Sequence, residues 1–472
     1  MSSQPPVPSP PSSQQPGGAA RPTRTVAELD RVFKAYDVRG LVPEEVDEDL
    51  ARAVGNAFVT VLGTDAVVVG HDMRPSSPGM ARAFAEGAAL AGADVTLIGL
   101  ASTDQLYFAS GHLDRPGAMF TASHNPAQYN GIKLCKAEAA PVGRETGLVE
   151  IRDLVAAGDL QQAATPGTVD EQDLLTAYAD HVLALAPVRG RRLKVVVDAG
   201  NGMAGLTAPA VLDRLDVEVL PLYFELDGSF PNHEANPIEP DNLRDLQAAV
   251  RESGADIGLA FDGDADRCFL VDERGELVSP STLTALIASR ELAKEPGATI
   301  IHNLITSRGV PEIVEELGGV PVRTRVGHSY IKAEMARTGA IFGGEHSGHF
   351  YFRDFWRADS GMLAGLHALA ALAEADGPLS QVLAPWARHV ASGEINSTVA
   401  DQAAVVAEIE QTWGALPGTS VDHLDGLSVV HDDWWFNVRA SNTEPLLRLN
   451  AEGRDQATME RLRDDVLAVI RR

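Results

Sequence analysis

The chain has 472 residues, of which 44% are hydrophobic and 22% are charged, as in ordinary globular proteins. Its 66 acidic and 39 basic side chains give a formal net charge of −27, so neither nucleic acid nor an anionic membrane surface is expected as a partner. Because domains cluster near about 100 to 150 residues, three or four domains are expected.

Residues 1–25 are dominated by Ser, Pro, Gln and Gly and are predicted to form a disordered tail. They contain no apolar run long enough for a signal peptide or an anchor. No later segment offers about 18 uninterrupted apolar residues, so no membrane span is expected. Two cysteines, Cys135 and Cys268, are too few for a disulfide framework and indicate reduced thiols in a cytoplasmic protein.

The first expected domain, residues 26–168, alternates strands and helices as a wound α/β protein does. A strand at 66–70, a helix at 80–91 and a strand at 94–99 precede the segment TASHNP at 121–126. Ser123 in this tight turn would expose its hydroxyl at the end of a strand, where a nucleophile or phosphate carrier belongs. A plain turn serine is the alternative.

The second expected domain, residues 169–280, begins with an acidic, Ala-rich helix at 170–186 and a strand at 194–199. Strand-like runs at 257–261 and 268–271 flank a loop with three alternating carboxylates and a guanidinium: Asp262, Asp264, Asp266 and Arg267. Hard oxygen ligands in a short acidic loop suit Mg2+. A calcium hand would require glycine where Arg267 stands; calcium and a solvated acidic turn are the alternatives.

The third expected domain, residues 281–390, opens with a strand at 298–301 and carries the glycine-framed loop GGEHSGH at 343–349. This loop presents a carboxylate, two imidazoles and a hydroxyl, from Glu345, His346, His349 and Ser347. Such a mixture can hydrogen-bond vicinal sugar hydroxyls, and an imidazole can assist proton transfer, although a lone histidine is more often a structural donor.

The fourth expected domain, residues 391–472, has strands at 426–430, 434–439 and 446–450 and a closing helix at 456–470, which indicates a smaller antiparallel α+β unit. Alternation along a strand sends Trp434 and Trp435 to opposite faces, so core packing is expected for one of them. The loop RASNTEP at 439–445 can grip a phosphate, with a helix cap as the alternative.

These loops, together with the segments 33–40, 70–77, 121–133 and 197–202, resemble the α-D-phosphohexomutase family, specifically its phosphomannomutase/phosphoglucomutase branch. The resemblance covers nearly the whole chain from about residue 32. It implies three similar wound α/β domains plus a smaller C-terminal α+β domain around a central cleft. The final domain is expected to swing and close this cleft. A monomer or weak homodimer is expected.

The resemblance implies an isomerase that moves phosphate between C1 and C6 of a hexose. A phosphate on Ser123 would be lent to a hexose phosphate, forming a hexose 1,6-bisphosphate that reorients and returns its other phosphate. Mg2+ would be held by Ser123, Asp262, Asp264 and Asp266. Catalytic roles are implied for Ser123, His124, Lys133, Arg39, Arg267 and His328, with His349 as a second acid/base candidate.

Substrate contacts are implied for the sugar loop (Glu345, His346, Ser347 and His349) and for a distal phosphate site (Arg439, Ser441, Asn442 and Thr443). The continuation of the sugar loop through 349–354 looks most like bacterial phosphomannomutases, so mannose phosphate is the expected substrate. Glucose phosphate or dual specificity is the alternative, ahead of phosphoglucosamine or a metal-dependent phosphatase. Because a phosphosugar needs a positive pocket, most of Arg39, Lys133, Arg267, Arg308, Arg325, Lys332 and Arg439 are expected to converge there. Ile305 stands where many relatives carry a lysine.

Overall fold

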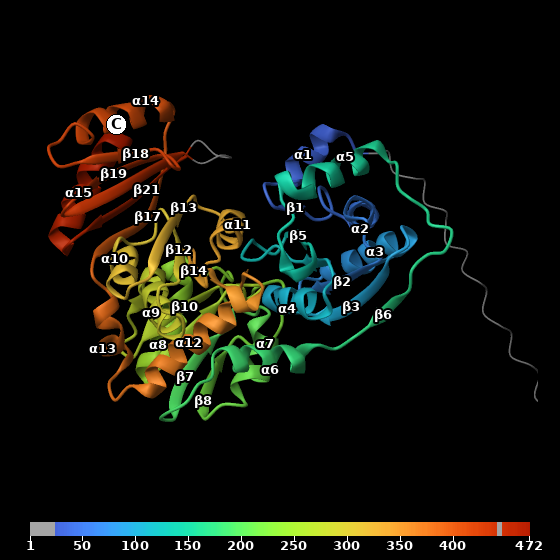
Figure 1. Cartoon of the computed structure of the whole chain (residues 1–472), viewed down its shortest axis with the longest axis horizontal. Helices are drawn as coiled ribbons and strands as arrows, with labels where there is room; N and C mark the ends of the chain where they lie inside the picture. Colours follow the sequence, from blue (N-terminus) through green and yellow to red (C-terminus); the bar gives the residue numbers. More distant parts are fainter. Residues whose placement is uncertain (1–23, 441–445) are drawn as a thin grey trace, which may run out of the picture.

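The structure is a computed structural model that describes residues 24–440 and 446–472. Residues 1–23, nearly all of the expected tail, lie outside the described residues. The rest of the chain folds into four sheets in sequence order, with helices packed against each (Figure 1). None of the helices in these ranges has the length and apolarity needed to cross a membrane.

The first domain has a six-stranded sheet in the order β1-β5-β4-β2-β3-β6. β2 pairs in parallel with β3 and β4, whereas β5 runs antiparallel to β4 and β1. The last strand extends this sheet past the boundary expected at residue 168. The elements are α1 (Val26–Val32), β1 (Asp37–Leu41), α2 (Glu48–Leu62), β2 (Ala66–His71), α3 (Ser77–Leu90), β3 (Asp94–Leu100), α4 (Thr103–Leu113), β4 (Gly117–Phe120), β5 (Tyr129–Cys135), α5 (Val149–Ala157) and β6 (Val169–Glu171).

The second domain has a five-stranded sheet in the order β11-β10-β9-β7-β8. Its β9 and β10 form an antiparallel hairpin whose connection is the acidic loop. α6 is shorter than the helix expected at 170–186, because residues 169–171 pair with β3 instead. The elements are α6 (Leu175–Leu185), β7 (Leu193–Asp198), α7 (Ala204–Leu212), β8 (Val217–Leu222), α8 (Arg244–Ser253), β9 (Ile257–Phe261), β10 (Cys268–Asp272) and β11 (Leu277–Val278).

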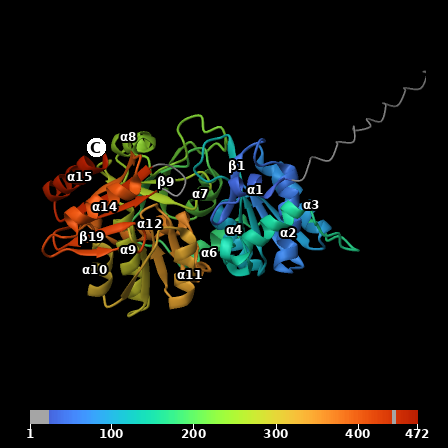
Figure 2. The ribbon, with the colours of Figure 1, turned by 90° about the horizontal axis from the view of Figure 1, so that it is seen from above.

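The third domain repeats the pattern with a sheet in the order β13-β12-β14-β15-β16. A continuous apolar cluster that includes Leu106, Val197 and Leu366 joins it to the first two domains. The buried residues of α12 belong to this cluster, and the helix packs against α9, beside which Figure 2 shows it. The elements are α9 (Pro280–Lys294), β12 (Thr299–Asn303), α10 (Gly309–Glu316), β13 (Val320–Thr324), α11 (His328–Thr338), β14 (Phe342–Gly344), β15 (Phe350–Phe352), β16 (Ala358–Asp359), α12 (Gly361–Glu374) and α13 (Leu379–Leu383).

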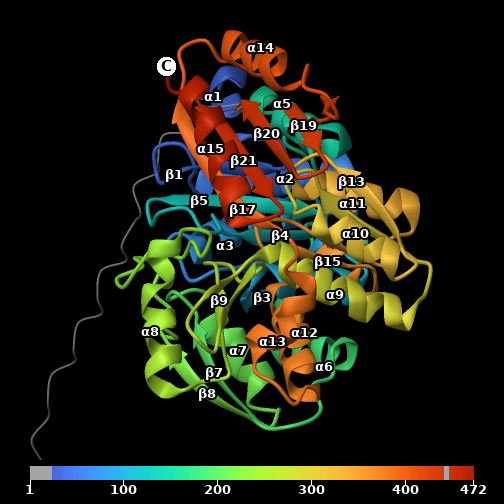
Figure 3. The same cartoon turned by 90° about the vertical axis from the view of Figure 1, so that its left-hand side faces the viewer.

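The fourth domain is a fully antiparallel sheet in the order β17-β21-β20-β19-β18, with α14 and α15 packed against it (Figure 3). It has its own apolar core. Trp435 is buried and donates its indole N–H to Glu452, whereas Trp434 stacks on His431. The expected arrangement of three wound domains and one smaller α+β domain is confirmed. The elements are β17 (Val390–Thr398), α14 (Gln402–Trp413), β18 (Ser420–Asp422), β19 (Leu427–His431), β20 (Trp434–Ala440), β21 (Leu446–Gly453) and α15 (Gln456–Ile470).

Candidate active site

The loop between β9 and β10 gathers three buried carboxylates. One oxygen from each of Asp262, Asp264 and Asp266 lies within 4.8 Å of the others, and none of the three residues is more than 1% exposed. The turn is closed by a hydrogen bond from the Ala265 amide to the Asp262 carbonyl. At Gly263 a Cβ would lie 2.5 Å from the Ser123 carbonyl oxygen, so glycine lets this loop touch the serine loop.

The electrostatics of the three acids fit a divalent cation. Burial, together with Asp266 and Asp264, raises the pKa of Asp262. Although burial opposes it, the charges of Lys133 and His349 hold the pKa of Asp266 well below its usual range. Among the described residues, no donor hydrogen-bonds to Oδ1 of Asp264. Three buried carboxylate oxygens facing one another could therefore hold a metal ion.

Ser123 follows β4 and lies against the acidic loop. Its Oγ donates to Asp262 Oδ2 at 2.8 Å, and the residue is 2% exposed. The backbone adopts a φ of 51°, which is uncommon for a residue with a side chain, and the Ser123 amide donates to Thr121 Oγ1 at 2.9 Å. The predicted phosphate carrier and the predicted metal loop, from two different domains, therefore share one site.

Arg74 hydrogen-bonds to the serine loop, the segment between β4 and β5 that carries Ser123. Arg74 was not among the site residues predicted from the sequence. This guanidinium is 1% exposed and donates to four backbone carbonyls of the loop, those of Ser123, Asn125, Pro126 and Tyr129, at 2.6–2.9 Å. Its Nε lies 3.3 Å from the buried Asp72. Because loop carbonyls buried without donors are costly, Arg74 stabilises the strained conformation at Ser123.

Three of the predicted cations, Lys133, Arg267 and Arg39, lie next to the serine and acidic loops. Lys133 on β5 places Nζ 2.7 Å from Asp264 and 2.6 Å from Asp266. Arg267 lies 2.9 Å from His124 Nδ1 and 3.4 Å from Asp262. The charge of Arg267, with burial, holds the pKa of His124 well below its usual range, so this imidazole is neutral and accepts from Arg267.

Arg39 on β1 donates to Asn125 Oδ1 at 2.7 Å and pairs with Asp37, at the edge of the serine loop. Lys332 lies deeper, paired with Asp359. The other expected cations have partners in the third and fourth domains. Arg308 bonds Glu312 and the His431 carbonyl, Arg325 lies over the Tyr330 ring, and Arg439 pairs with Glu394 and Asp425. Arg39, Lys133 and Arg267 therefore lie at the serine and acidic loops, and Lys332 lies beside them through Asp359.

The sugar loop between β14 and β15 is organised around Glu345, which is 2% exposed. Its carboxylate accepts from the Tyr351 hydroxyl at 2.9 Å, from the Gly327 amide at 3.2 Å and from Asn303 at 3.3 Å. Ser347 Oγ lies 3.3 Å from the same carboxylate and 3.1 Å from His349 Nδ1. The loop joins the acidic loop through a backbone bridge between His349 and Arg267.

The two loop histidines have different surroundings. Burial and Arg267 oppose protonation of His349, but Asp266 and Asp359 raise its pKa above the usual value. His346 instead lines a pocket with Ile305, Trp435 and Glu452 at the boundary with the fourth domain, and burial lowers its pKa. His346 therefore has neighbours different from those of Glu345, Ser347 and His349.

Some expected residues lie outside the described part of the chain. Ser441, Asn442 and Thr443 of the expected phosphate loop are among them. His328 begins α11, but its side chain is also outside the description. The structure in turn adds Thr103, which sequence reasoning missed. Its Oγ1 donates to Asp264 Oδ2 at 2.6 Å and its amide to the Asp264 carbonyl at 2.9 Å. In the sequence, Thr103 belongs to a helix-capping pattern after Ser102, which gave no signal of a distant partner.

Comparison with known proteins agrees with this arrangement. Four successive domain descriptions match the chain: phosphoglucomutase/phosphomannomutase alpha/beta/alpha domains I, II and III at residues 30–162, 176–275 and 279–389, and the C-terminal domain at residues 394–469. The chain belongs to the phosphoglucomutase/phosphomannomutase family. Each matched range contains most of one observed sheet, so the serine, acidic and sugar loops lie in the matches to domains I, II and III, respectively.

Relatives in the family align over almost their full length. A protein of Xanthomonas campestris named "Phosphohexose mutases" is 42% identical over 431 residues, covering 90% of this chain and 96% of the relative. A phosphomannomutase of Salmonella typhimurium is 42% identical over 449 residues, covering 93% and 98%. A crystal structure of a phosphoglucomutase/phosphomannomutase family protein from Burkholderia thailandensis superimposes with a TM-score of 0.85 at 33% identity, covering 93% of this chain and 96% of that one.

Proposed function

We propose that this protein is a phosphomannomutase, which interconverts mannose 6-phosphate and mannose 1-phosphate through a phosphoserine at Ser123 and a hexose 1,6-bisphosphate. The observation that carries the proposal is the 2.8 Å contact between Ser123 Oγ and Asp262, in a buried site that also holds Lys133 and Arg267. A hydroxyl beside acids and cations is suited to accept and donate a phosphoryl group.

Phosphoryl transfer requires in-line positioning and neutralisation of charge on the transferring oxygens more than covalent chemistry. Lys133 and Arg267 supply fixed positive charge on two sides of the serine loop. Arg74 and Gly263 fix the position of Ser123 relative to the acidic loop. In the first transfer the phosphorus–oxygen bond to Ser123 breaks and a bond to a sugar oxygen forms, while that sugar oxygen loses its proton and the Ser123 oxygen takes one up. In the second transfer a phosphorus–oxygen bond at the other end of the bisphosphate breaks and the bond to Ser123 forms again, with the protons moving in the opposite direction.

Asp262, Asp264 and Asp266, with the phosphorylated Ser123, would hold Mg2+. When bound, the ion supplies positive charge that offsets the about −1.5 to −2 carried by a seryl phosphate among three acids. Binding of the ion can be measured independently of activity, by thermal unfolding. Mg2+ should raise the midpoint of thermal unfolding, by linkage to the folded state, and Asp264→Asn should reduce that increase.

The sugar would be recognised by Glu345 and Ser347, whose polar atoms form one cluster with His349. His349 would take the proton of the attacking hydroxyl, because it lies between the sugar loop and the acidic loop. Arg439 with Ser441, Asn442 and Thr443 would hold the distal phosphate. Activity on glucose phosphates is the second candidate, since a loop that reads one hydroxyl discriminates epimers by only about a few kcal/mol.

The deciding experiment is a coupled assay that compares mannose 1-phosphate with glucose 1-phosphate, in the presence of Mg2+ and a catalytic amount of hexose 1,6-bisphosphate. We expect the higher kcat/KM with mannose 1-phosphate. A much higher value with glucose 1-phosphate would overturn the proposed substrate and leave the mechanism standing.

Ser123→Ala tests the mechanism itself. Intact-mass analysis of the purified protein should find one phosphoryl group on the wild-type chain and none on this variant, whose mutase activity should be lost. A phosphatase is the competing activity, so release of inorganic phosphate is measured in parallel. Steady phosphate release without isomerisation would contradict the mutase proposal.

A further inference from the structure

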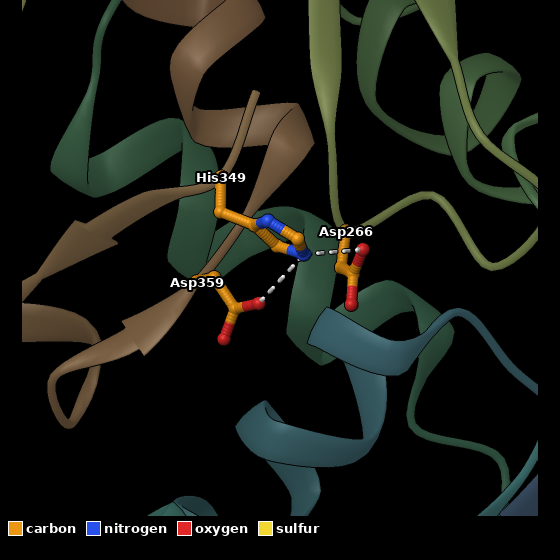
Figure 4. A group of neighbouring side chains, drawn as sticks. All are labelled: Asp266, His349 and Asp359. Carbon is orange, nitrogen blue, oxygen red and sulfur yellow. Dashed lines mark ion pairs between the residues drawn. The ribbon is translucent and has the colours of Figure 1, made fainter. Parts of the chain in front are cut away.

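Acidic groups lie at both edges of the His349 imidazole, and Figure 4 shows the two that face Nε2, Asp266 and Asp359. Its Nε2 lies 3.5 Å from Asp266 Oδ1 and 3.8 Å from Asp359 Oδ2, so two carboxylates from different domains face one nitrogen. The other nitrogen, Nδ1, lies 3.1 Å from Ser347 Oγ and 3.5 Å from Glu345 Oε2. The residue is only 9% exposed, so neighbouring groups rather than solvent determine how the ring lies.

Asp359 is itself held firmly at the end of β16. Its Oδ1 lies 2.7 Å from Nζ of Lys332, and both side chains are 3% exposed. The Lys332 ammonium also lies 4.0 Å from the centre of the Tyr107 ring, which belongs to α4 of the first domain. The pairing directs one oxygen of Asp359 to Lys332 and leaves the other facing His349.

The residue after Asp359 adds a second attachment to the first domain. Ser360 Oγ donates to Asp104 Oδ2 at 2.7 Å, and Asp104 also accepts from the Tyr178 hydroxyl at 2.7 Å. Thr103, the neighbour of Asp104, bonds Asp264 of the acidic loop. The start of α4 therefore fixes the strand end that carries Asp359 and the acidic loop in one frame.

We propose that Asp359, fixed by Lys332, is a positioning residue that holds the His349 imidazole between the sugar loop and the acidic loop. This inference rests on the proposed function, in which His349 takes the proton of the attacking sugar hydroxyl. Asp359 reaches the reaction only through His349. Carboxylates that orient metal-binding imidazoles contribute about 10- to 100-fold to affinity or activity, and we expect an effect of this size for the ion pair with His349.

The test removes the ion pair as a unit. Asp359→Asn alone would leave a buried ammonium without its acid, which endangers folding, so the main variant combines Asp359→Asn with Lys332→Met. We expect it to fold, to keep KM for mannose 1-phosphate within about threefold, and to lose about 10- to 100-fold in kcat. A kcat equal to that of the wild type would overturn the inference.

A merely structural pair and a positioning pair are separated by a mutant cycle with His349→Ala. If Asp359 acts through His349, removing the pair from the His349→Ala protein lowers kcat no further. If the loss of kcat from removing the pair multiplies with the loss from His349→Ala, the inference is overturned. The matched control is the exposed pair of Arg353 and Asp354 on the same segment, whose Nε and Oδ1 lie 3.0 Å apart. Arg353→Met with Asp354→Asn should leave kcat within about twofold, since exposed pairs contribute little.

If the variant with Asp359→Asn and Lys332→Met does not fold, Asp359→Glu is used to test the inference instead. It keeps an acid for Lys332 but moves the carboxylate by one methylene, so kcat should fall with KM unchanged, and only when His349 is present. A wild-type kcat in Asp359→Glu would then contradict the inference that Asp359 positions His349. If His349→Ala itself keeps the wild-type kcat, the proposed proton step and this inference both fail. If His349→Ala is inactive and the Asp359 variants are not impaired, this inference fails alone.

Discussion

Lys133 Nζ lies 2.6 Å from Asp266 Oδ2, so a lysine from the first sheet neutralises an acid from the second. The same ammonium lies 2.7 Å from Asp264 Oδ2. These two acids raise the pKa of Lys133 well above its usual value, although burial opposes the charge. The pair is one of the contacts by which the two domains define a single site.

We predict that Lys133→Met lowers the free energy of unfolding by about 3 to 5 kcal/mol when Mg2+ is absent, because two buried carboxylates lose their cation. Added Mg2+ should recover more stability in this variant than in the wild type, since the ion replaces the lost charge. Urea unfolding with EDTA and with Mg2+ measures both effects. Lys194→Met is the control, because Lys194 is 32% exposed and lies 3.7 Å from Glu218. Equal losses in the two variants would contradict the prediction.

Gly263→Ala should lower kcat by about 100-fold, because its Cβ would lie 2.5 Å from the Ser123 carbonyl and push the two loops apart. Steady-state kinetics and the extent of phosphorylation by intact mass are the measurements. Gly365→Ala in α12 is the control, since its Cβ would meet neighbours at ordinary contact distances of 3.5 Å or more. An unchanged kcat in Gly263→Ala would mean that the loops tolerate separation.

Arg74→Lys should loosen the serine loop, because an ammonium cannot reproduce the planar fork that reaches four carbonyls. Hydrogen exchange of residues 121–130 should become faster, and kcat should fall about tenfold or more. Arg82→Lys on α3 is the control, since Arg82 is exposed and eight positions away. If hydrogen exchange of residues 121–130 is as slow in Arg74→Lys as in the wild type, contacts other than those of Arg74 hold the loop conformation.

Asp104 predicts a pH dependence of stability. Burial raises its pKa to about 6 from a usual value of 3.8, so the folded state holds a proton that the unfolded state releases between these values. The stability contributed by this group is therefore fully present below about pH 4 and is lost as pH rises through about 6. The shift corresponds to roughly 3 kcal/mol.

Asp104→Asn removes this titration. The stability of the wild type minus that of Asp104→Asn should fall by roughly 3 kcal/mol between about pH 4 and pH 7, as measured by urea unfolding at each pH. Taking the difference cancels the titration of the other carboxylates. A flat difference across this range would contradict the raised pKa, and an increase would reverse its sign.

Much of the architecture could be predicted from local pattern. The hairpin strands at 257–261 and 268–272 and the helix at 456–470 follow from apolar runs and helical periodicity. The N-terminal part of the expected helix at 170–186 was wrong, because residues 169–171 pair with β3, a partner 74 positions earlier in the register. Strand pairing across such separations is decided by packing that no local pattern contains.

The site was predictable to the same degree. Ser123 and the three acids stand in recognisable loops, but the residues that hold these loops in place do not belong to recognisable motifs. Thr103 meets Asp264 across 161 positions, and Ser360 meets Asp104 across 256. These contacts depend on how the three cores pack, so hydroxyls with ordinary capping patterns gave no sign of them. The partners of Arg308, Arg325 and Arg439, which are Glu312, Tyr330 and Glu394, could not be predicted from the sequence either.

The contact between Gly263 and Ser123 has a consequence for biosynthesis. The serine loop leaves the ribosome well before the acidic loop that it touches, and the strand carrying Asp359 follows later still. A chain released after its first unit has folded would hold the hydroxyl beside Lys133 and Arg39 but would lack the three acids of the second unit. Competence to take up phosphate therefore matures late, and phosphate on Ser123 would report that the acidic loop has assembled against the serine loop.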